Sequence, residues 1–366
     1  MLLRSSGVEA LIINGDLKPT QHYALENSLK VECVDRIRLI LEIFTSRAMS
    51  NESRLQVEKA RLKYEIPLLR EWIHSAKMGE HPGFLGGGEY AVDVYYDLIK
   101  RRIGKIDDEL RRLGESKDQR RVQRKKKGFN LVSLAGYTNA GKSSLMKRLT
   151  GEEVFVEDRL FSTLSTTTKK LQESSLPILV TDTIGFMSGF PPFIIEAFKS
   201  TITEIFNADL VLLVVDSSEG RDAIEMKIST SEKILFPDVE LERVFLVLNK
   251  IDKIDMVERK VLIRLMEDRG YSSRVFPSSA VTGEGIDSLH EGIVARFSHR
   301  VEFQLTLPQT GETESFLTWL RRKASISVLE YSNEVRVVGT CDEVDMKKLR
   351  ERTSSLRAKA VFIALT

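Results

Sequence analysis

Short apolar runs in the middle of the chain each end in a polar motif, and helix-length amphipathic segments separate them. The runs are NLVSLAG, LPILVTD, DLVLLVVD, RVFLVLNK and RVFPSSA, all between residues 129 and 298. Strands that alternate with helices in this way predict a doubly wound, mostly parallel α/β sheet. Ligands of such sheets bind at the carboxyl ends of the strands, which is where the polar motifs fall.

The region before this sheet is predicted to contain a small strand–helix–strand unit followed by two long helices. Residues 8–34 predict a strand, a helix from Pro19 to about Leu29, and a second strand. Apolar residues at three- and four-residue steps then predict a long helix from Arg36 to Lys77, kinked or broken at Pro67. A glycine-rich loop at 79–89 leads to a second long helix, so the two predict an antiparallel hairpin. Its expected apolar face is Val94, Leu98, Ile99, Ile103, Ile106, Leu110 and Leu113.

The last segment, residues 301–366, has the order strand, helix, strand, strand, helix, strand. This order predicts a small α+β domain with a ferredoxin-like fold. We therefore expect three domains: an α/β unit with the helical hairpin at 1–127, the nucleotide-binding domain at 128–299 and the small domain at 300–366.

Composition indicates an ordinary globular chain of 366 residues, with 42% hydrophobic and 30% charged residues. Cys33 and Cys341 lie far apart and match no metal or redox spacing, so we expect two thiols and no bridge. The first residues lack a signal-peptide pattern, and no apolar stretch is long enough to span a bilayer. We expect a cytoplasmic monomer without a membrane partner.

Positive charge is concentrated in one place although the net charge is only +2. Residues 100–127 contain 13 Lys or Arg against 5 Asp or Glu, and the run ends in RRVQRKKK. A solvated helix face and a polyanion partner explain this run equally well. No aromatic residue interrupts the basic ones, so any nucleic-acid contact would be to phosphates and would weaken with salt.

The strongest chemical motif is GYTNAGKS, residues 136–143, which has the P-loop spacing between an apolar strand and a helix. Its glycines let backbone N–H groups face a phosphate, Lys142 supplies a cation to the β- and γ-phosphates, and Ser143 offers a hydroxyl to Mg²⁺.

The DTIG motif follows a later strand. Asp182 would hold Mg²⁺ through water, and the Gly185 N–H would approach the γ-phosphate.

Two further motifs predict guanine recognition. In NKID, Asp252 can accept hydrogen bonds from N1–H and the N2 amino group, which adenine does not offer. In SSAVTGEG, the backbone N–H groups of Ser279 and Ala280 would face guanine O6.

Phe186 stands where Ras-like enzymes have a glutamine that orients water. Phenylalanine cannot bond water in this way, so either another group positions the water or turnover stays slow until a partner completes the site; alternatively Phe186 is simply packed. We expect slow basal turnover.

The threonine-rich segment FSTLSTTT, Phe161 to Thr168, should supply the hydroxyl that completes the magnesium shell. From the residues alone, Thr163, Thr166, Thr167 and Thr168 all remain candidates. We predict catalytic roles for Lys142 and Gly185. The predicted nucleotide-binding residues are Gly136, Tyr137, Thr138, Asn139, Ala140, Gly141, Lys142, Ser143, Ser144, Phe161, Ser162, Thr163, Leu164, Ser165, Asp182, Thr183, Ile184, Gly185, Asn249, Lys250, Ile251, Asp252, Ser279, Ala280 and Val281.

The chain resembles the HflX family of GTPases, within the Obg–HflX group. The resemblance rests on LFSTLSTTTKK, on DTIGF, on the helical segment 34–69 and on FLGGGE followed by DLIKRRI, and it covers roughly residues 8–298. It implies that Thr163 joins Ser143 and Asp182 as a Mg²⁺ ligand. It also implies contact of the N-terminal domain with ribosomal RNA of the large subunit, and Asn139 resembles the asparagine of K⁺-assisted relatives.

These patterns predict a GTPase that binds GTP and Mg²⁺ and associates with the large ribosomal subunit in a nucleotide-dependent way. One alternative is a nucleotide-dependent binding module with little catalysis, in which Phe186 marks lost activity. Another is a GTPase that acts on a different RNA.

Overall fold

The computed structural model of the chain describes residues 8–79, 87–151, 166–174, 176–186, 192–298, 300–321, 323–356 and 358–364. The chain folds into two compact units, Met1–Leu289 and His290–Thr366. Cys33 and Cys341 are buried free thiols, as expected. None of the helices within the described ranges combines the length and the hydropathy that a bilayer crossing requires.

The first unit begins with a small strand–helix–strand element, as predicted. Strands β1 (Ala10–Ile12) and β2 (Glu32–Val34) pair in parallel, and α2 (Pro19–Leu29) connects them. Pro19 occupies the first turn of α2, where a helix does not need the N–H that proline lacks. Both strands are shorter than the apolar runs suggested.

The predicted long helix after β2 is in fact two helices, α3 (Arg36–Arg47) and α4 (Asn51–Gly79). The helix does not break at Pro67, which is inside α4, so a break there is contradicted, while a kink at Pro67 stays a prediction. Ser50 and Ser53 cap the start of α4 reciprocally. The Ser50 hydroxyl accepts from the Ser53 N–H at 3.0 Å, and the Ser53 hydroxyl accepts from the Ser50 N–H at 3.1 Å. These bonds satisfy amides that a helix start leaves free, so the chain ends one helix and begins another there.

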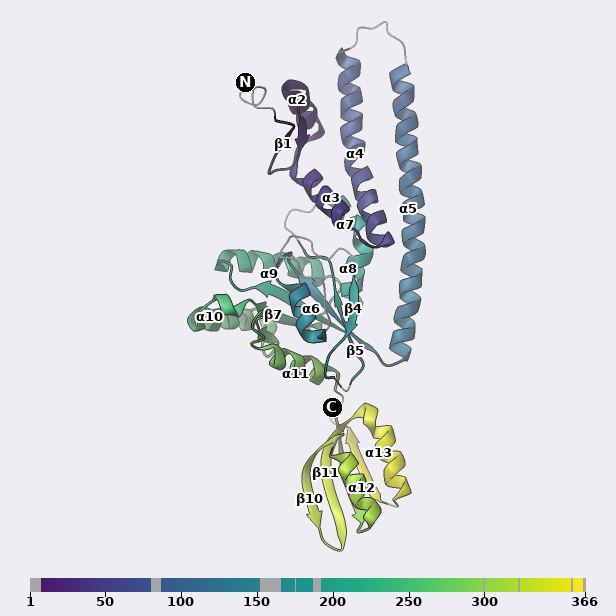
Figure 1. Cartoon of the computed structure of the whole chain (residues 1–366), viewed down its shortest axis with the longest axis vertical. Coiled ribbons are helices and arrows are strands. Elements are labelled where there is room, and N and C mark those ends of the chain that lie inside the picture. Colours follow the sequence, from purple (N-terminus) through teal and green to yellow (C-terminus); the bar gives the residue numbers. More distant parts are fainter. Residues whose placement is uncertain are drawn as a thin grey trace. The chain divides into compact units, whose positions relative to one another are not determined.

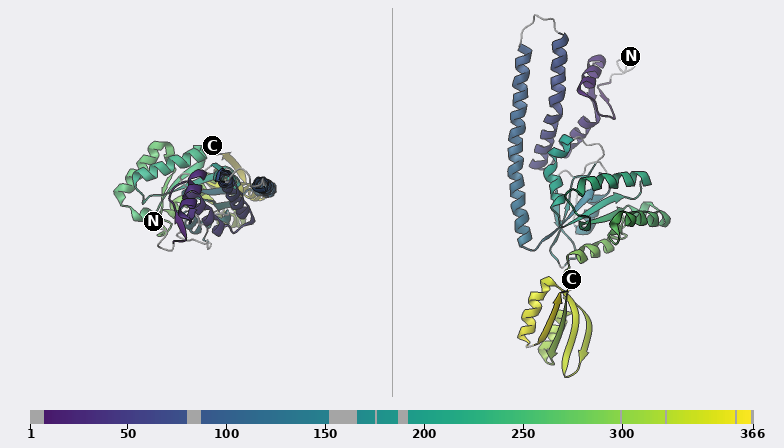
Figure 2. Two further views of the ribbon diagram at one scale, coloured as in Figure 1. Left: turned by 90° about the horizontal axis from the view of Figure 1, so that it is seen from above. Right: turned by 180° about the vertical axis from the view of Figure 1, so that it is seen from behind.

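The helical hairpin is formed by α4 and α5 (Gly87–Lys126), which run antiparallel side by side in both Figure 1 and Figure 2. Ile99 and Ile106 are buried, as the apolar face predicted. Val94 and Leu98, expected on the same face, are exposed. Helix α5 packs mainly on α4, so only a narrow line of its side chains is buried. The rest of the predicted apolar face is therefore exposed.

A six-stranded sheet forms the centre of the first unit, in the order β4-β5-β3-β6-β7-β8. All neighbouring strands are parallel except β4 and β5, so the predicted mostly parallel sheet is confirmed and the antiparallel edge strand β4 is an addition. Nearly all residues of β6 and β7 are buried, as expected for strands covered on both faces. The strands are β3 (Asn130–Gly136), β4 (Thr167–Lys170), β5 (Ile178–Asp182), β6 (Leu210–Asp216), β7 (Val244–Asn249) and β8 (Val275–Pro277).

Helices and short turns connect these strands and cover the sheet (Figure 1). Tyr271, in the turn after α10, is fully buried in the main core with residues of β6 and β7. The helices are α6 (Lys142–Thr150), α7 (Pro192–Ala197), α8 (Lys199–Phe206), α9 (Arg221–Leu235), α10 (Met256–Met266) and α11 (Ile286–Phe297). The turns are η1 (Leu241–Arg243), η2 (Ile251–Lys253) and η3 (Glu267–Tyr271).

The second unit has the predicted ferredoxin-like fold. Its strands form one antiparallel sheet in the order β10-β11-β9-β12, and Phe303, Leu305 and Val337 lie in the core against α12 and α13. The elements are β9 (Arg300–Pro308), α12 (Gly311–Leu320), β10 (Ala324–Tyr331), β11 (Glu334–Asp342), α13 (Glu343–Ser355) and β12 (Lys359–Ala364).

Candidate nucleotide-binding site

The turn between β3 and α6 has the backbone of a phosphate-binding loop. Gly136 has φ +134°, and a Cβ there would lie 2.2 Å from the Val214 carbonyl oxygen, so only glycine fits. Gly141 has φ +91° and is the N-cap of α6, whose first residue is Lys142. The positive end of α6 therefore faces the turn, which favours an anion at this position.

Lys142 is buried against this turn and points along it. Its Nζ donates to the carbonyl oxygens of Tyr137 at 2.9 Å and Gly136 at 3.2 Å. Burial disfavours the charged amine and lowers the pKa of Lys142 to about 8, although Asp182 acts in the opposite direction. A bound polyphosphate would restore the charge that burial disfavours, so the side chain is prepared for an anionic ligand.

Ser143 and Asp182 come together as the two motifs predicted. The Ser143 hydroxyl donates to Oδ2 of Asp182 at 2.6 Å, and both residues are buried. Oδ1 of Asp182 accepts from the Thr183 N–H at 2.9 Å, which fixes the carboxylate at the end of β5. Two hard oxygen donors thus lie beside the phosphate-binding turn.

Gly185 lies against the P-loop backbone. A Cβ on Gly185 would lie 2.8 Å from the backbone of Thr138, so a side chain there would clash with the loop. The Phe186 N–H donates to the Gly136 carbonyl, and the Phe186 carbonyl accepts from the Thr138 N–H, each at 2.9 Å. The Phe186 ring is buried in the main core. The ring is therefore packed, and which group positions the attacking water stays a prediction.

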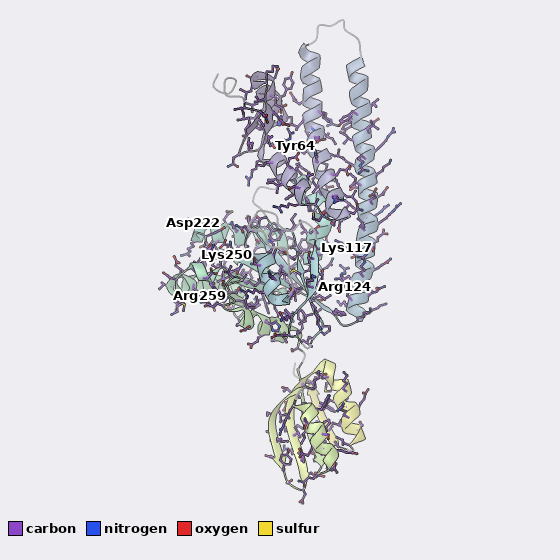
Figure 3. All side chains as sticks on the ribbon, in the orientation of Figure 1. Tyr64, Lys117, Arg124, Asp222, Lys250 and Arg259 are labelled. Carbon is purple, nitrogen blue, oxygen red and sulfur yellow. The ribbon has the colours of Figure 1, made fainter. Side chains whose placement is uncertain are left out.

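Asn249 joins three segments of the site. Its Nδ2 donates to the Ala140 carbonyl of the P-loop at 2.8 Å, and its Oδ1 accepts from the Ala280 N–H at 3.0 Å. Lys250 has φ +64°, and its Nζ lies 2.6 Å from Oδ2 of Asp216 at the end of β6. Burial favours the neutral acid, but hydrogen bonds from Lys250 and Ser218 outweigh it, so the pKa of Asp216 lies below its ordinary value. Lys250 is labelled in Figure 3.

The residues predicted to select the base lie just after β7 and β8. Asp252 is exposed, and its Oδ1 accepts a hydrogen bond from the Ser279 hydroxyl. The N–H groups expected to face guanine O6 are engaged within the protein, because Ser279 N–H donates to Glu284 O at 2.8 Å and Ala280 N–H donates to Asn249. Val281 is largely exposed.

Some predicted site residues have side chains that serve the fold instead. The Thr183 hydroxyl donates to the Leu134 carbonyl at 2.6 Å, and Ile251 is buried. Ile184 is buried among residues of α3, α4 and α7. Thr168, one of the four candidate threonines, lies in β4, and its hydroxyl is 2.9 Å from that of Thr181. The predicted residues Phe161, Ser162, Thr163, Leu164 and Ser165 lie outside the described residues.

The N-terminal helices pack directly on the segment that follows DTIG. Phe44 of α3 and Phe198 beside α7 meet edge to face with ring centroids 5.2 Å apart. Gln56 of α4 donates to the Thr201 hydroxyl of α8 at 3.3 Å, and both are buried. Lys117 of α5 lies 2.6 Å from Glu204 of α8. The helical region and the DTIG segment therefore share one core.

Two residues that contact predicted site residues were not themselves predicted from the sequence. Asp216 anchors Lys250, and its place at the carboxyl end of β6 is a signal that could have indicated it. Arg148 of α6 donates to the carbonyls of Ala280 and Val281, a contact without a sequence signal. A phosphate-binding turn and a base-selecting aspartate at one edge of a parallel sheet define a P-loop protein that binds guanine nucleotides.

Comparison with known proteins agrees with this class. Residues 131–250 match a family model described as 50S ribosome-binding GTPase. Residues 47–126 match the middle region, and residues 1–45 the N-terminal region, of a family of GTP-binding GTPases. The crystal structure of the SsGBP and GDP complex is similar, with 29% identity, a TM-score of 0.50, and coverage of 80% of this chain and 82% of that chain.

Curated relatives specify the family. The GTPase HflX of Thermofilum pendens is 41% identical over 313 residues, which cover 85% of this chain and 73% of that protein. The GTPase HflX of Thermococcus kodakarensis is 39% identical over 345 residues, or 92% of this chain and 78% of that protein. The chain therefore belongs to the HflX family of GTPases: it binds GTP and GDP and hydrolyses GTP.

Proposed function

We propose that this GTPase uses Mg²⁺ to hydrolyse GTP and associates with the large ribosomal subunit in a nucleotide-dependent way through its N-terminal region. One observation carries the proposal: Ile184 is buried in the same cluster as Phe44 and Val57 of the N-terminal helices. Ile184 directly precedes Gly185, the residue that would contact the γ-phosphate. A shift of this segment on hydrolysis would therefore change what the N-terminal helices pack against.

The proposed nucleotide contacts follow from the positions of the motifs. P-loop amides and Lys142 would hold the β- and γ-phosphates, and Asp252 would accept N1–H and the N2 amino group of guanine. The variant Asp252→Asn tests the base contact, because its amide would suit xanthine better than guanine. Competition binding should show the preference moving from GTP toward XTP. An unchanged preference would refute the base assignment.

The residues present fit a magnesium ion. Ser143 Oγ and Asp182 Oδ2 are oxygen donors 2.6 Å apart beside the P-loop. Mg²⁺ is usually held by one or two protein oxygens together with phosphates and water. Ser143 and Asp182 would hold the ion, with Thr163 as the third protein ligand that the family implies. When bound, Mg²⁺ would neutralise charge on the β- and γ-phosphates.

The protein's own contribution to hydrolysis is positioning and charge. Lys142 and the Gly185 N–H would stabilise negative charge on the γ-phosphate in the transition state. Because the Phe186 ring is buried in the core, it offers the attacking water no hydrogen bond, which supports slow basal turnover.

Asn139 is exposed in the P-loop with φ +64° and would be the residue that responds to K⁺. Equal hydrolysis rates in K⁺ and Na⁺ would exclude that role.

The basic end of α5 supports an RNA partner. Arg124, Lys125, Lys126 and Lys127 form no ion pair with any residue in the described ranges. Lys117, Arg121 and Arg124 also line a cavity of about 350 Å³ between α5 and the sheet edge. Lys117 and Arg124 are labelled on α5 in Figure 3. Unpaired cations on a helix suit the phosphates of an RNA backbone. The matched family description, 50S ribosome-binding GTPase, agrees with this partner.

Co-sedimentation with separated ribosomal subunits tests the proposal. We expect binding to the large subunit with a non-hydrolysable GTP analogue and weaker binding with GDP. A charge-matched pair of variants sharpens the test. Changing residues 124–127 to Gln should weaken binding and reduce its salt dependence. Changing Lys233, Lys260, Arg264 and Lys348 to Gln should not. Equal binding in both nucleotide states, or to both subunits, would contradict the proposal.

We also propose that the chain has three functional parts, residues 1–127, 128–299 and 300–366, and acts as a monomer. The antiparallel sheet at 300–366 lies within the second compact unit. Deleting residues 300–366 should leave GTP hydrolysis intact. Light scattering of the full chain should give the mass of one 41.6 kDa copy.

A further inference from the structure

Arg148 connects the helix that follows the P-loop with the loop that follows β8. Its Nε donates to the Ala280 carbonyl oxygen at 2.8 Å, and its Nη2 donates to the Val281 carbonyl oxygen. Arg148 lies on α6, the helix that begins at Lys142. One helix therefore carries the phosphate-binding lysine at one end and holds the base-reading loop near the other.

The two bonds fix two successive peptide planes. The described peptides are trans, so each carbonyl points opposite to the N–H of the next residue. Because Arg148 holds the Ala280 carbonyl toward α6, the Val281 N–H points the other way. The Ala280 N–H is already engaged by Asn249 Oδ1, whereas the Val281 N–H donates to no residue in the described ranges. The Val281 N–H is therefore an available donor at this edge of the sheet.

The second peptide plane leads to the base-selecting aspartate. Arg148 holds the Val281 carbonyl, and the opposite N–H, that of Thr282, donates to the Ser279 hydroxyl at 3.1 Å. The Ser279 hydroxyl in turn donates to Asp252 Oδ1. The same guanidinium thus supports the hydroxyl that orients the carboxylate.

We propose that Arg148 is a positioning residue for guanine recognition. By holding the Ala280 carbonyl it aims the Val281 N–H at guanine O6, and by holding the Val281 carbonyl it supports Ser279 against Asp252. The O6 donor is then Val281, in place of the Ser279 and Ala280 amides expected from the sequence. The inference rests on guanine binding at this site and adds the residue that positions the groups which contact the base.

The test compares GTP with two analogues in Arg148→Met, which keeps the apolar stem of the side chain. 6-Thio-GTP differs from GTP only in having sulfur at O6, and ITP lacks only the N2 amino group. In Arg148→Met we expect the preference for GTP over 6-thio-GTP to fall about fivefold, the usual net effect of one hydrogen bond. The preference over ITP should fall less, because Asp252 itself remains.

Two further variants separate positioning from general support of the fold. Arg148→Lys, which can reach one carbonyl at a time, should retain part of the preference. Lys147→Met removes the neighbouring cation of α6, which forms no side-chain hydrogen bond or ion pair with the described residues, and should leave both ratios at the wild-type value.

The measured quantity is a ratio of dissociation constants, so a uniform loss of affinity does not mimic the expected result. If Arg148→Met weakens all three nucleotides equally, or changes nothing, the proposal is overturned. Thermal melts confirm that each variant is folded. The wild-type protein tests the guanine site itself: if it binds GTP no better than ATP, the nucleotide assignment fails, independently of Arg148.

Discussion

The nucleotide edge of the sheet and the contact with the N-terminal helices are held together by different forces. At the nucleotide edge, short buried hydrogen bonds join distant segments. Ser143 meets Asp182 at 2.6 Å, and Asn249 meets Ala140 at 2.8 Å. At the helical contact, Phe44, Ile184 and Phe198 lie in an apolar cluster. Hydrogen bonds require one geometry, whereas apolar packing is non-directional.

This difference predicts that the nucleotide edge keeps a fixed geometry, whereas the contact with the helices can shift. The polar network keeps the phosphate and base sites in a fixed relation. The contact with the helices is mostly apolar and tolerates small shifts, as packed helices do in shear motions, and the directional bonds that cross it are few, such as Gln56 to Thr201 and Lys117 to Glu204. Ile184 and Gly185 stand at the junction of the two regions, since Gly185 touches Thr138 of the P-loop and Ile184 packs on the helices.

The largest effect should follow from emptying the apolar contact. Phe44 is fully buried, so Phe44→Ala should lower the free energy of unfolding by about 4 kcal/mol through lost contacts and a cavity. Leu39 lies on the same helix but is exposed, and Leu39→Ala should cost under about 1 kcal/mol. Urea denaturation measures both. Similar losses in the two variants would show that this cluster does not hold the helices in place.

The second prediction concerns Lys142 at the nucleotide edge of the sheet, where activity and stability should respond differently to one substitution. Lys142→Met should slow single-turnover hydrolysis by about a hundredfold or more, because it removes a charge that stabilises the transition state. The same change removes a buried cation whose pKa is lowered by burial. The ligand-free variant should therefore unfold at the wild-type denaturant concentration or above it. A variant that is both inactive and clearly less stable would contradict this view of the polar edge.

The third effect is a pH dependence of GTP binding. In the ligand-free protein the pKa of Lys142 is about 8, and the triphosphate should raise it. Above pH 8, GTP binding must then take up a proton, so affinity should fall by up to about tenfold per pH unit. The folded pKa lies below the unfolded value, so the stability of the ligand-free protein should rise between pH 8 and 10.5 as the buried charge is lost.

Lys142→Met is the control for this pH profile. Its affinity for GTP, though weaker, should change little between pH 8 and 9, because the titrating amine is absent and guanine N1–H still carries most of its proton there. Isothermal titration calorimetry in two buffers of different ionisation enthalpy measures the proton uptake directly. No uptake by the wild-type protein at pH 9 would exclude Lys142 as the titrating group.

The nucleotide site could largely be located from the sequence, because each motif follows an apolar strand and strand ends meet at one edge. GYTNAGKS, DTIG and NKID lie where the alternation of strands and helices predicted. Arg148 could not be found this way. A basic residue on a helix surface normally indicates solvent, and its acceptors are backbone carbonyls 132 and 133 residues away.

The fold departs from the sequence prediction where local patterns are weak. Strand β4, with the sequence TTKK, is polar, and no strand was predicted there; pairing with β5 makes it a strand. Pro67 suggested a helix break, but packing of α4 on α5 and α2 outweighs the hydrogen bond that proline removes. The actual break depends on two serines whose capping role is visible only with coordinates.

The smallest effect concerns the ion pairs of Lys117 with Glu52 and Glu204, which form a charged rim around the apolar contact. Lys117 of α5 lies 2.7 Å from Glu52 at the start of α4 and 2.6 Å from Glu204 of α8. Burial opposes the charged amine, but Glu204 and Glu52 outweigh it, so the pKa of Lys117 lies above its ordinary value. Lys117→Met should lower the free energy of unfolding by about 1 kcal/mol, since one cation neutralises two partly buried carboxylates.

A matched variant decides whether this pair of bonds matters. Lys105 is exposed on the same helix and forms no ion pair within the described ranges, so Lys105→Met should change stability by no more than about 0.3 kcal/mol. The loss in Lys117→Met should shrink in about 1 M NaCl, because salt screens charges that solvent reaches. If the loss is the same at low and high salt, Lys117 stabilises the contact through packing of its stem. The rim would then be held by the same non-directional force as the cluster it surrounds.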